Sequence, residues 1–262
     1  MLGAIIGDIV GSIYEFDNIK TKDFPFFGRR CTFTDDSVMT IAVYLAIKNA
    51  KSDYSDLEDK AIYYMQKLGR EYPNRGYGGN FRFWLINPNP KPYNSFGNGS
   101  AMRVSPCGFY AKSLEEAKLL SAKVTKVSHN HPEGMKGSEA TAVAIYLARN
   151  KKTKEEIKEY INKHYYKIDF TLDEIRPVYF FNEICQNTVP QALEAFFEAN
   201  SYEDAIRNAI SIGGDSDTLA AITGAVAEAY FGIPEDIKNK GISYLDDKLK
   251  DIVNDYYANL NK

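Results

Sequence analysis

Two short acidic segments each combine threonine with two aspartates at the start of a run whose apolar spacing is helical. They are "TFTDD", residues 32–36, and "GGDSDT", residues 213–218. One helix cap needs one side-chain oxygen, whereas these segments offer four carboxylates and two hydroxyls. The surplus indicates a role beyond capping. The candidate ligands are Thr34, Asp35, Asp36, Asp215, Asp217 and Thr218.

A third acidic position is Glu15, at the end of "GDIVGSIYE", a segment that also contains Asp8. If Glu15 and the four aspartates converge, each pair of charges 4 Å apart repels by about 4 kcal/mol at an effective dielectric near 20. Two divalent cations would neutralise the cluster. Carboxylates and hydroxyls suit hard ions such as Mg²⁺ or Mn²⁺, whereas zinc favours His or Cys. We therefore expect two divalent cations, Mg²⁺ or Mn²⁺, as cofactors.

Local geometry supports this interpretation. In an extended segment, Asp215 and Asp217 point the same way, and Gly213 and Gly214 permit the tight turn that delivers such a segment. We expect Thr218 to begin the following helix. An Asp-Asp-x-x-Asp helix, as in prenyl-diphosphate synthases, is set aside because "DDSVM" lacks the third aspartate.

The bulk composition excludes several classes of protein. The 262 residues carry 32 basic and 35 acidic side chains, a net charge of −3 that gives no footprint for nucleic acid. Apolar runs are too short for a membrane span, and the N-terminus lacks the basic region of a signal peptide. The three widely spaced cysteines fit neither a disulfide framework nor a zinc site. We expect a cytoplasmic protein, and a monomer, because nothing in the sequence requires a partner.

Helical patterns dominate, and convincing strand alternation is absent. Capping boxes are predicted at Ser55–Glu58 and Ser113–Glu116, and Pro132 at a first turn. The exception is residues 75–106, a loop rich in Gly, Asn and Pro that contains the single tryptophan. We predict one all-α domain over 1–262. Helices are expected over 37–50, 54–72, 113–128, 132–150, 153–166, 189–200, 201–214, 218–232 and 234–260.

The order of these motifs resembles the ADP-ribosylglycohydrolase family. The matching segments are "GAIIGDIVGSIYE", "FTDDSVMT", "RGYGGNFRFWL", "SFGNGSAMRVSP", "SHNHPEGMKGSEATA" and "GGDSDTLAAITGAVAEAYFG". The resemblance implies a multi-helix orthogonal bundle with a binuclear Mg²⁺ or Mn²⁺ centre held by the six ligands named above. It also implies hydrolysis of the bond between ADP-ribose and an acceptor, on an ADP-ribosylated protein or a small ADP-ribose conjugate.

The resemblance also assigns the substrate residues. Glu15 would lie beside the metals and the ribose, either as a movable ligand or as the group that orients water, and Asp35 and Asp36 join it as candidate catalytic residues. "SFGNGSAMR" would bind ADP-ribose, with His129 as a further contact and Phe96 placed to stack on adenine or cover the ribose. The candidate substrate-binding residues are Ser95, Phe96, Gly97, Asn98, Gly99, Ser100, Met102 and His129.

The expected mechanism passes through an oxocarbenium-like state, with Glu15 or a ligating aspartate accepting the proton of water. The acceptor linkage stays open between arginine, serine or another O-linked form, and acetate. Arginine-specific members often have an acidic residue just before the Gly-Asn-Gly turn, whereas this chain has Asn94 or Ser95 there.

Two other functions remain open. One is an inactive ADP-ribose-binding or structural family member, although the full ligand set argues against it. The other is a two-metal phosphohydrolase acting on a nucleotide.

Overall fold

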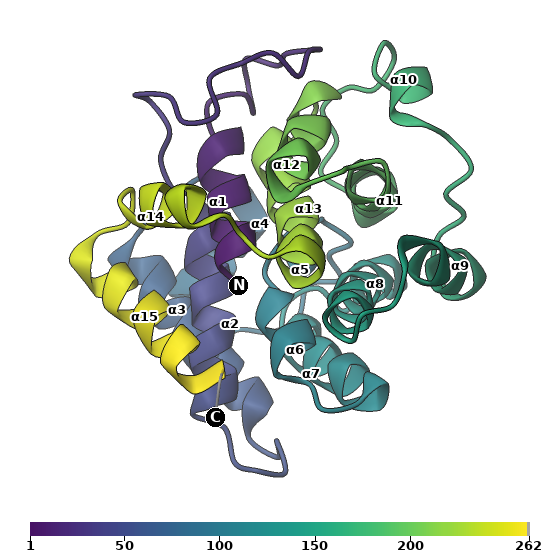
Figure 1. Ribbon diagram of the computed structural model, residues 1–262. Coiled ribbons are helices and arrows are strands. Elements are labelled where there is room, and N and C mark those ends of the chain that lie inside the picture. The colour runs from purple at the N-terminus through teal and green to yellow at the C-terminus, as the bar shows by residue number, and fades with distance from the viewer. Residues whose placement is uncertain (261–262) are drawn as a thin grey trace.

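The structure is a computed structural model that describes residues 1–260, and α-helices dominate it (Figure 1). No strand occurs in this part of the chain, where one isolated antiparallel bridge joins Gly97 to Ile184. The all-α prediction is confirmed, and the last two residues of the predicted domain lie outside the described residues. The helices are α1 (Leu2–Gly11), α2 (Asp35–Lys48), α3 (Leu57–Glu71), α4 (Gly79–Ile86), α5 (Gly99–Met102), α6 (Ser105–Tyr110), α7 (Leu114–Lys126), α8 (Pro132–Arg149), α9 (Lys154–His164), α10 (Leu172–Ile175), α11 (Cys185–Phe197), α12 (Tyr202–Ser211), α13 (Ser216–Phe231), α14 (Glu235–Ile242) and α15 (Asp247–Leu260).

Most predicted helices are present, with ends that differ by a few residues. Pro132 does begin α8, and Ser113 caps α7 by accepting the amide hydrogen of Glu116. The Glu116 side chain, however, accepts from the amide of Lys112, so the reciprocal half of that capping box is missing. The Ser55–Glu58 box is wrong, because α3 begins at Leu57 after Asp56.

Three other expectations need correction. The predicted loop 75–106 contains α4 and α5 and the start of α6. The predicted helix 234–260 is interrupted between α14 and α15. The predicted helix 189–200 begins earlier, at Cys185, so that Pro190 lies inside α11. Apolar periodicity predicted which segments are helical. It could not predict where these helices begin, end or are interrupted, because those positions depend on contacts elsewhere in the fold.

The helix α1 was not predicted, although it lies at the centre of the molecule (Figure 1). Its glycines lower its intrinsic helix propensity, but they follow one face at every fourth residue and allow close packing on α13. A Cβ atom on Gly3, Gly7 or Gly11 would lie 2.3, 2.0 or 2.5 Å from a carbonyl oxygen of α13. The two helix backbones are therefore in direct contact.

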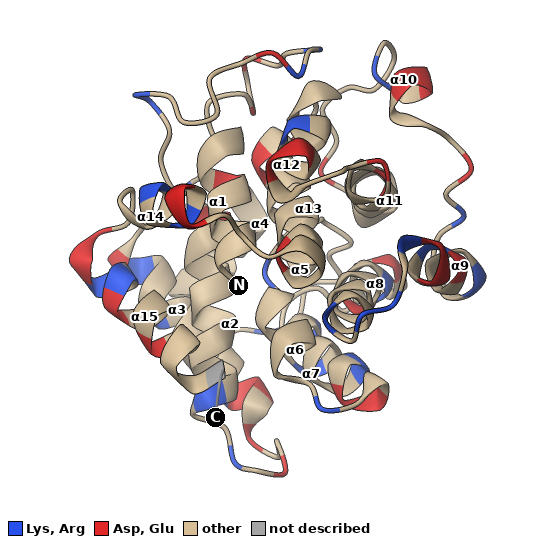
Figure 2. Ribbon diagram, viewed as in Figure 1, with Lys and Arg blue, Asp and Glu red and all other residues tan. Residues whose placement is uncertain are grey.

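Burial follows from this arrangement. All residues of α1 are buried, and α13 is buried from Ser216 to Ala227. Figure 2 shows Lys, Arg, Asp and Glu gathered on peripheral helices such as α9 and α15, while α1, α2 and α13 are mostly free of them. Within residues 1–260, no helix combines the length and the apolar character that a membrane span requires.

The contact between α1 and α13 predicts a large effect of one methyl group. We expect Gly7→Ala to lower the free energy of unfolding by about 3 kcal/mol, because its Cβ atom would overlap the Ala220 carbonyl. Gly79→Ala is the control, since no atom lies within 4 Å of a Cβ added there, and it should change stability by less than about 0.5 kcal/mol. Urea unfolding followed by circular dichroism measures both, and equal effects would contradict the proposed backbone contact.

Candidate functional site

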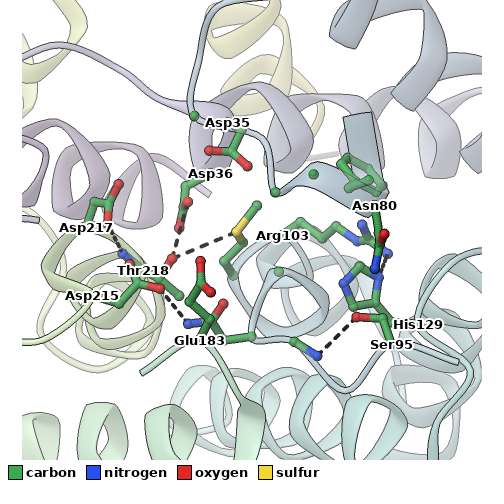
Figure 3. A pocket seen from close by; sticks show the side chains of 18 of the residues that line it. Asp35, Asp36, Asn80, Ser95, Arg103, His129, Glu183, Asp215, Asp217 and Thr218 are labelled. Atoms are coloured by element: carbon green, nitrogen blue, oxygen red, sulfur yellow. Dashed lines mark hydrogen bonds between the residues drawn. The ribbon is translucent and has the colours of Figure 1, made fainter. Parts of the chain in front are cut away.

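Three segments far apart in sequence bring the predicted acidic residues together (Figure 3). Glu15 comes from the chain after α1, Asp35 and Asp36 from the N-terminus of α2, and Asp215 and Asp217 from that of α13. One carboxylate oxygen from each of Glu15, Asp215 and Asp217 lies within 4.8 Å of the others. The convergence inferred from the sequence is present in the fold.

The two threonines connect the acidic segments. The hydroxyl oxygen of Thr34 lies 3.4 Å from Oδ2 of Asp217, and that of Thr218 lies 3.4 Å from Oδ2 of Asp36. Each threonine thus faces an aspartate of the other segment. These contacts and the grouping of Asp215 with Asp217 connect five of the six predicted ligands, and Asp35 lines the same pocket.

The local geometry around α13 differs from the extended segment that was expected. Gly213 and Gly214 do adopt positive φ angles, of 72° and 83°. The helix, however, already begins at Ser216, so Asp215 is its N-cap residue and Asp217 lies in its first turn. Asp217 Oδ1 accepts the amide hydrogen of Thr218 at 3.0 Å. A helical N-terminus, rather than strand-like alternation, therefore presents these two carboxylates.

Burial and mutual repulsion raise the pKa values in the cluster. Burial first, and then the charges of Asp215, Asp8 and Glu183, raise the pKa of Glu15 to about 7. The pKa values of Asp35, Asp36 and Asp217 are well above their ordinary range, mainly because of burial and secondly because of neighbouring carboxylates. The protein alone leaves this cluster short of positive charge.

These residues fit hard divalent cations. Asp36 Oδ1 is buried and accepts no hydrogen bond within residues 1–260, and an unpartnered buried oxygen is costly unless something binds it. The donors are carboxylate and hydroxyl oxygens, which Mg²⁺ and Mn²⁺ favour. Thr34, Asp35, Asp36, Asp215, Asp217 and Thr218 could hold such ions, with Glu15 beside them.

Asp8 organises the first segment, a role that the sequence did not reveal. This fully buried carboxylate accepts hydrogen bonds from the backbone amides of Thr34 and Ser37, at 2.9 and 3.0 Å, and from both of their hydroxyls. Burial raises the pKa of Asp8 to about 6, although these hydrogen bonds oppose the shift. The single hydrogen of the Thr34 hydroxyl points to Asp8 Oδ1, 2.7 Å away. One lone pair of the Thr34 hydroxyl oxygen accepts the amide hydrogen of Asp36 at 3.4 Å, and the other remains free toward the acidic cluster.

The Gly-Asn-Gly loop forms the opposite wall of the same pocket. Its backbone is fixed to the segment before α11, because the amide of Asn98 donates to the Glu183 carbonyl at 2.8 Å and that of Cys185 donates to the Phe96 carbonyl at 3.0 Å. The Asn98 side chain then donates to Asp215 Oδ2 at 2.7 Å. A hydrogen bond therefore joins the Gly-Asn-Gly loop to the acidic cluster.

Most of the predicted substrate residues line this pocket. They are Ser95, Gly97, Asn98, Gly99, Met102 and His129. Two predicted residues do not. Ser100 is buried behind the loop, where it donates to the Gly97 carbonyl at 2.9 Å. The ring of Phe96 lies against His131, with centroids 5.0 Å apart, and is 42% exposed outside the pocket lining.

Several lining residues had no predicted role. They are Gly76, Gly78, Gly79, Asn80, Phe81, Tyr93, Arg103 and Glu183. Five of them belong to "RGYGGNFRFWL", a segment that the sequence singled out only as a motif. Arg103 ends "SFGNGSAMR". Glu183 lies outside every motif, and the bridge between Gly97 and Ile184 helps to bring its segment to the site.

Comparison with known proteins places this architecture in a family. The profile described as ADP-ribosylglycohydrolase matches residues 1–261, and the chain belongs to that family. The ADP-ribosylhydrolase ARH3 of Mus musculus is 25% identical, with 90% of this chain and 83% of that protein covered.

Two bacterial proteins are similar to the same degree. The ADP-ribosylarginine hydrolase Tri1 of Pseudomonas putida is 26% identical, covering 89% of this chain and 70% of the relative. The ADP-ribosyl-[dinitrogen reductase] glycohydrolase of Rhodospirillum rubrum is 25% identical, covering 95% and 90%. A solved structure described as an ADP-ribosylglycohydrolase-related protein complex superposes with a TM-score of 0.63 at 21% identity, covering 96% of this chain and 94% of that one. This last likeness concerns the fold alone.

Metal binding should be visible as thermal stabilisation. At about a hundred times its dissociation constant, Mn²⁺ should stabilise the protein by about 2.7 kcal/mol, which raises Tm by roughly 5–10 °C. The double variant Asp215→Asn/Asp217→Asn should lose this response. The control Asp247→Asn/Asp251→Asn removes the same charge from exposed positions and should keep it. Scanning fluorimetry with Mn²⁺ and with EDTA makes the comparison, and a response retained in the first variant would exclude this cluster as the binding site.

The raised pKa values predict an unusual pH dependence in EDTA. The pKa of Glu15 is about 7 in the folded protein and near 4.5 when unfolded, so folding favours its protonated form. Its contribution to stability is fully present below about pH 4.5 and is lost as pH rises through about 7. We expect the Tm of the metal-free protein to fall over this range, with a shallower fall in Asp215→Asn/Asp217→Asn. Parallel pH profiles for the two proteins would contradict the coupling.

Proposed function

We propose that this protein hydrolyses the glycosidic bond between ADP-ribose and an acceptor, with two divalent cations, Mg²⁺ or Mn²⁺, as cofactors. The observation that supports this most directly is the convergence of Glu15 and the two Thr/Asp segments in one pocket with the Gly-Asn-Gly loop. Membership of the ADP-ribosylglycohydrolase family supports the reaction class. The proposed substrate is an ADP-ribosylated protein or a small ADP-ribose conjugate.

Each part of the pocket has a task in this proposal. When bound, two divalent cations would neutralise the carboxylates, hold ribose hydroxyls and lower the pKa of a water molecule. Asp8 and Asn98 hold Thr34 and Asp215 in place from behind. Glu15, which is half-buried, would accept a proton from the attacking water, with a ligating aspartate as the alternative.

The carboxylates also favour cleavage electrostatically. Glycoside hydrolysis passes through a state with positive charge on the sugar ring, and Glu15 and Glu183 both line the pocket. Negative charge beside such a ring lowers the energy of that state relative to the neutral substrate. The inactive-member alternative has less support, because every predicted ligand is present and directed into one cluster.

The acceptor linkage remains part of the test. Of the two residues before the Gly-Asn-Gly turn, Ser95 lines the pocket, whereas Asn94 is exposed with a φ angle of 55°. A serine there offers no charge to pair with a guanidinium. This favours an O-linked conjugate over ADP-ribosyl-arginine, although one relative, Tri1 of Pseudomonas putida, is named as an ADP-ribosylarginine hydrolase.

The deciding experiment measures free ADP-ribose released from conjugates linked through arginine, serine and acetate. We expect release from at least one conjugate with Mg²⁺ or Mn²⁺, no release in EDTA, and at least about a hundredfold loss in Asp215→Asn/Asp217→Asn. The control Asp247→Asn/Asp251→Asn should retain wild-type rates. Circular dichroism checks that all variants are folded.

The alternatives give different outcomes. Release of phosphate from nucleotides without ADP-ribose release would establish a phosphohydrolase. Binding of ADP-ribose by calorimetry, with no turnover of any conjugate, would indicate a binding protein. Unchanged turnover in the double variant would exclude the acidic cluster as the catalytic site.

A further inference from the structure

The pocket contains a buried cation that no carboxylate neutralises. Arg103 is fully buried beside the Gly-Asn-Gly loop, and no ion pair joins it to an acidic residue within residues 1–260. Its Nε atom has no hydrogen-bond partner there. Burial lowers the pKa of Arg103 to about 10, so the side chain is still charged at neutral pH. Buried charges are normally paired with an opposite charge. The Arg103 cation instead contacts neutral side chains, Ser128 and His129.

Arg103 is linked to His129 through Ser128. Nη2 of Arg103 donates to the hydroxyl oxygen of Ser128 at 2.8 Å, and that oxygen lies 2.8 Å from Nδ1 of His129. Nη2 also lies 3.4 Å from the same Nδ1 (Figure 3). An arginine can only donate, so the serine hydroxyl passes its own hydrogen on to Nδ1. Nδ1 is therefore an acceptor, and the ring proton lies on Nε2.

The other ring nitrogen faces an open part of the pocket. Cβ atoms added to Gly97 and Gly99 would lie 3.7 and 3.5 Å from Nε2 of His129, so the two glycines keep this space free. Nε2 forms no hydrogen bond within the described residues. The rings of Tyr93 and Phe81, with centroids 5.7 and 6.1 Å away, hold the imidazole in position. Nε2 of His129 is therefore a fixed hydrogen-bond donor that is directed into the pocket.

The imidazole is also kept neutral. Burial first, and then the adjacent Arg103 cation, lower the pKa of His129 well below its ordinary 6.5. The titratable side chains that face the ring are Arg103 and Tyr93, and neither is an acid that would favour imidazolium. His129 is accordingly a hydrogen-bond donor at neutral pH and not a proton carrier.

We propose that Arg103 and Ser128 are positioning residues that fix His129 as an Nε2–H donor to a negatively charged oxygen of the ligand at the Gly-Asn-Gly loop. The unpaired cation supplies the positive potential that favours an anion there. The inference rests on the proposed function for the identity of that anion, which would be the diphosphate of ADP-ribose. In this proposal, the residues at this end of the pocket bind the ligand and take no part in proton transfer.

The first test is the tautomer of His129 in the wild-type protein. The chain has three histidines, so ¹⁵N-histidine labelling gives three ring patterns, assigned with His131→Asn and His164→Asn. We expect His129 to show only the Nε2–H tautomer from about pH 6 to about pH 8, without titrating. A Nδ1–H tautomer of His129, or titration of His129 near pH 6.5, would overturn the proposal. This test needs no substitution at the site itself.

The second test changes the residues behind the imidazole. Arg103→Met should allow both tautomers and raise the pKa of His129 in part, because burial, the larger cause of the low pKa, remains. Arg103→Lys, which keeps a charged donor, should preserve part of the wild-type pattern. Ser128→Ala leaves the cation in place and should broaden the tautomer distribution less than Arg103→Met. A wild-type His129 pattern in Arg103→Met would show that Arg103 does not position the ring.

The third test concerns the ligand, with ADP and adenosine as probes in EDTA so that no metal contributes. His129→Asn should lower ADP affinity about tenfold, the effect of one lost hydrogen bond, and leave adenosine affinity unchanged. His129→Gln, whose amide nitrogen reaches further and can replace Nε2–H, should recover most of the loss. Equal losses for both probes, or none, would overturn the anion assignment.

These results are independent of hydrolysis. If no conjugate is hydrolysed but the tautomer and the ADP preference are found, the proposed function fails and the donor assignment holds. If ADP-ribose is released but His129 titrates normally, the proposed function holds and the donor assignment fails.

Discussion

The direct contact between the backbones of α1 and α13 is the constraint on which the site depends. Larger side chains at the positions of α1 that face α13 would hold the two helices apart. Glycine at every fourth residue leaves no Cβ atom at these positions. At this separation the chain after α1 carries Glu15 to Asp215 and Asp217. Asp8, on the same helix, reaches the N-terminus of α2. One close helix pair therefore sets the position of all three acidic segments.

The pocket that results is divided by charge. One end gathers carboxylates at two helix N-termini, where the helix dipoles favour them but burial and mutual repulsion outweigh that benefit and raise their pKa values. The other end has the buried Arg103 cation beside a neutral His129. Asn98 joins the two ends through its side chain on Asp215. Such a pocket complements cations at one end and an anion at the other, and the proposed hydrolysis of a diphosphate-containing conjugate would use both.

The sequence predicted the parts of this arrangement that depend on local chemistry. Surplus oxygens beside Thr34 and Thr218 predicted a shared site, and helical periodicity predicted the fold class. It could not predict α1, since glycine disfavours helix locally and only packing on α13 favours it. Nor could it predict that Asp215 and Asp217 lie on a helical N-terminus, or that Phe96 turns toward His131 and Arg103 toward the site. Those outcomes depend on long-range neighbours such as Glu183 and Ser128, which no local pattern specifies.

The same division decides which residue can handle the proton of the attacking water. His129, the usual candidate for such a role at neutral pH, is neutral and has its Nδ1 occupied by Ser128 and Arg103. Glu15 has the opposite environment, with a pKa raised to about 7 by burial and by neighbouring acids. Positive charge bound among those acids would lower the pKa of Glu15 and favour its carboxylate form. In the proposed reaction, proton acceptance therefore belongs to the acidic end, and the histidine contributes only a directed hydrogen bond.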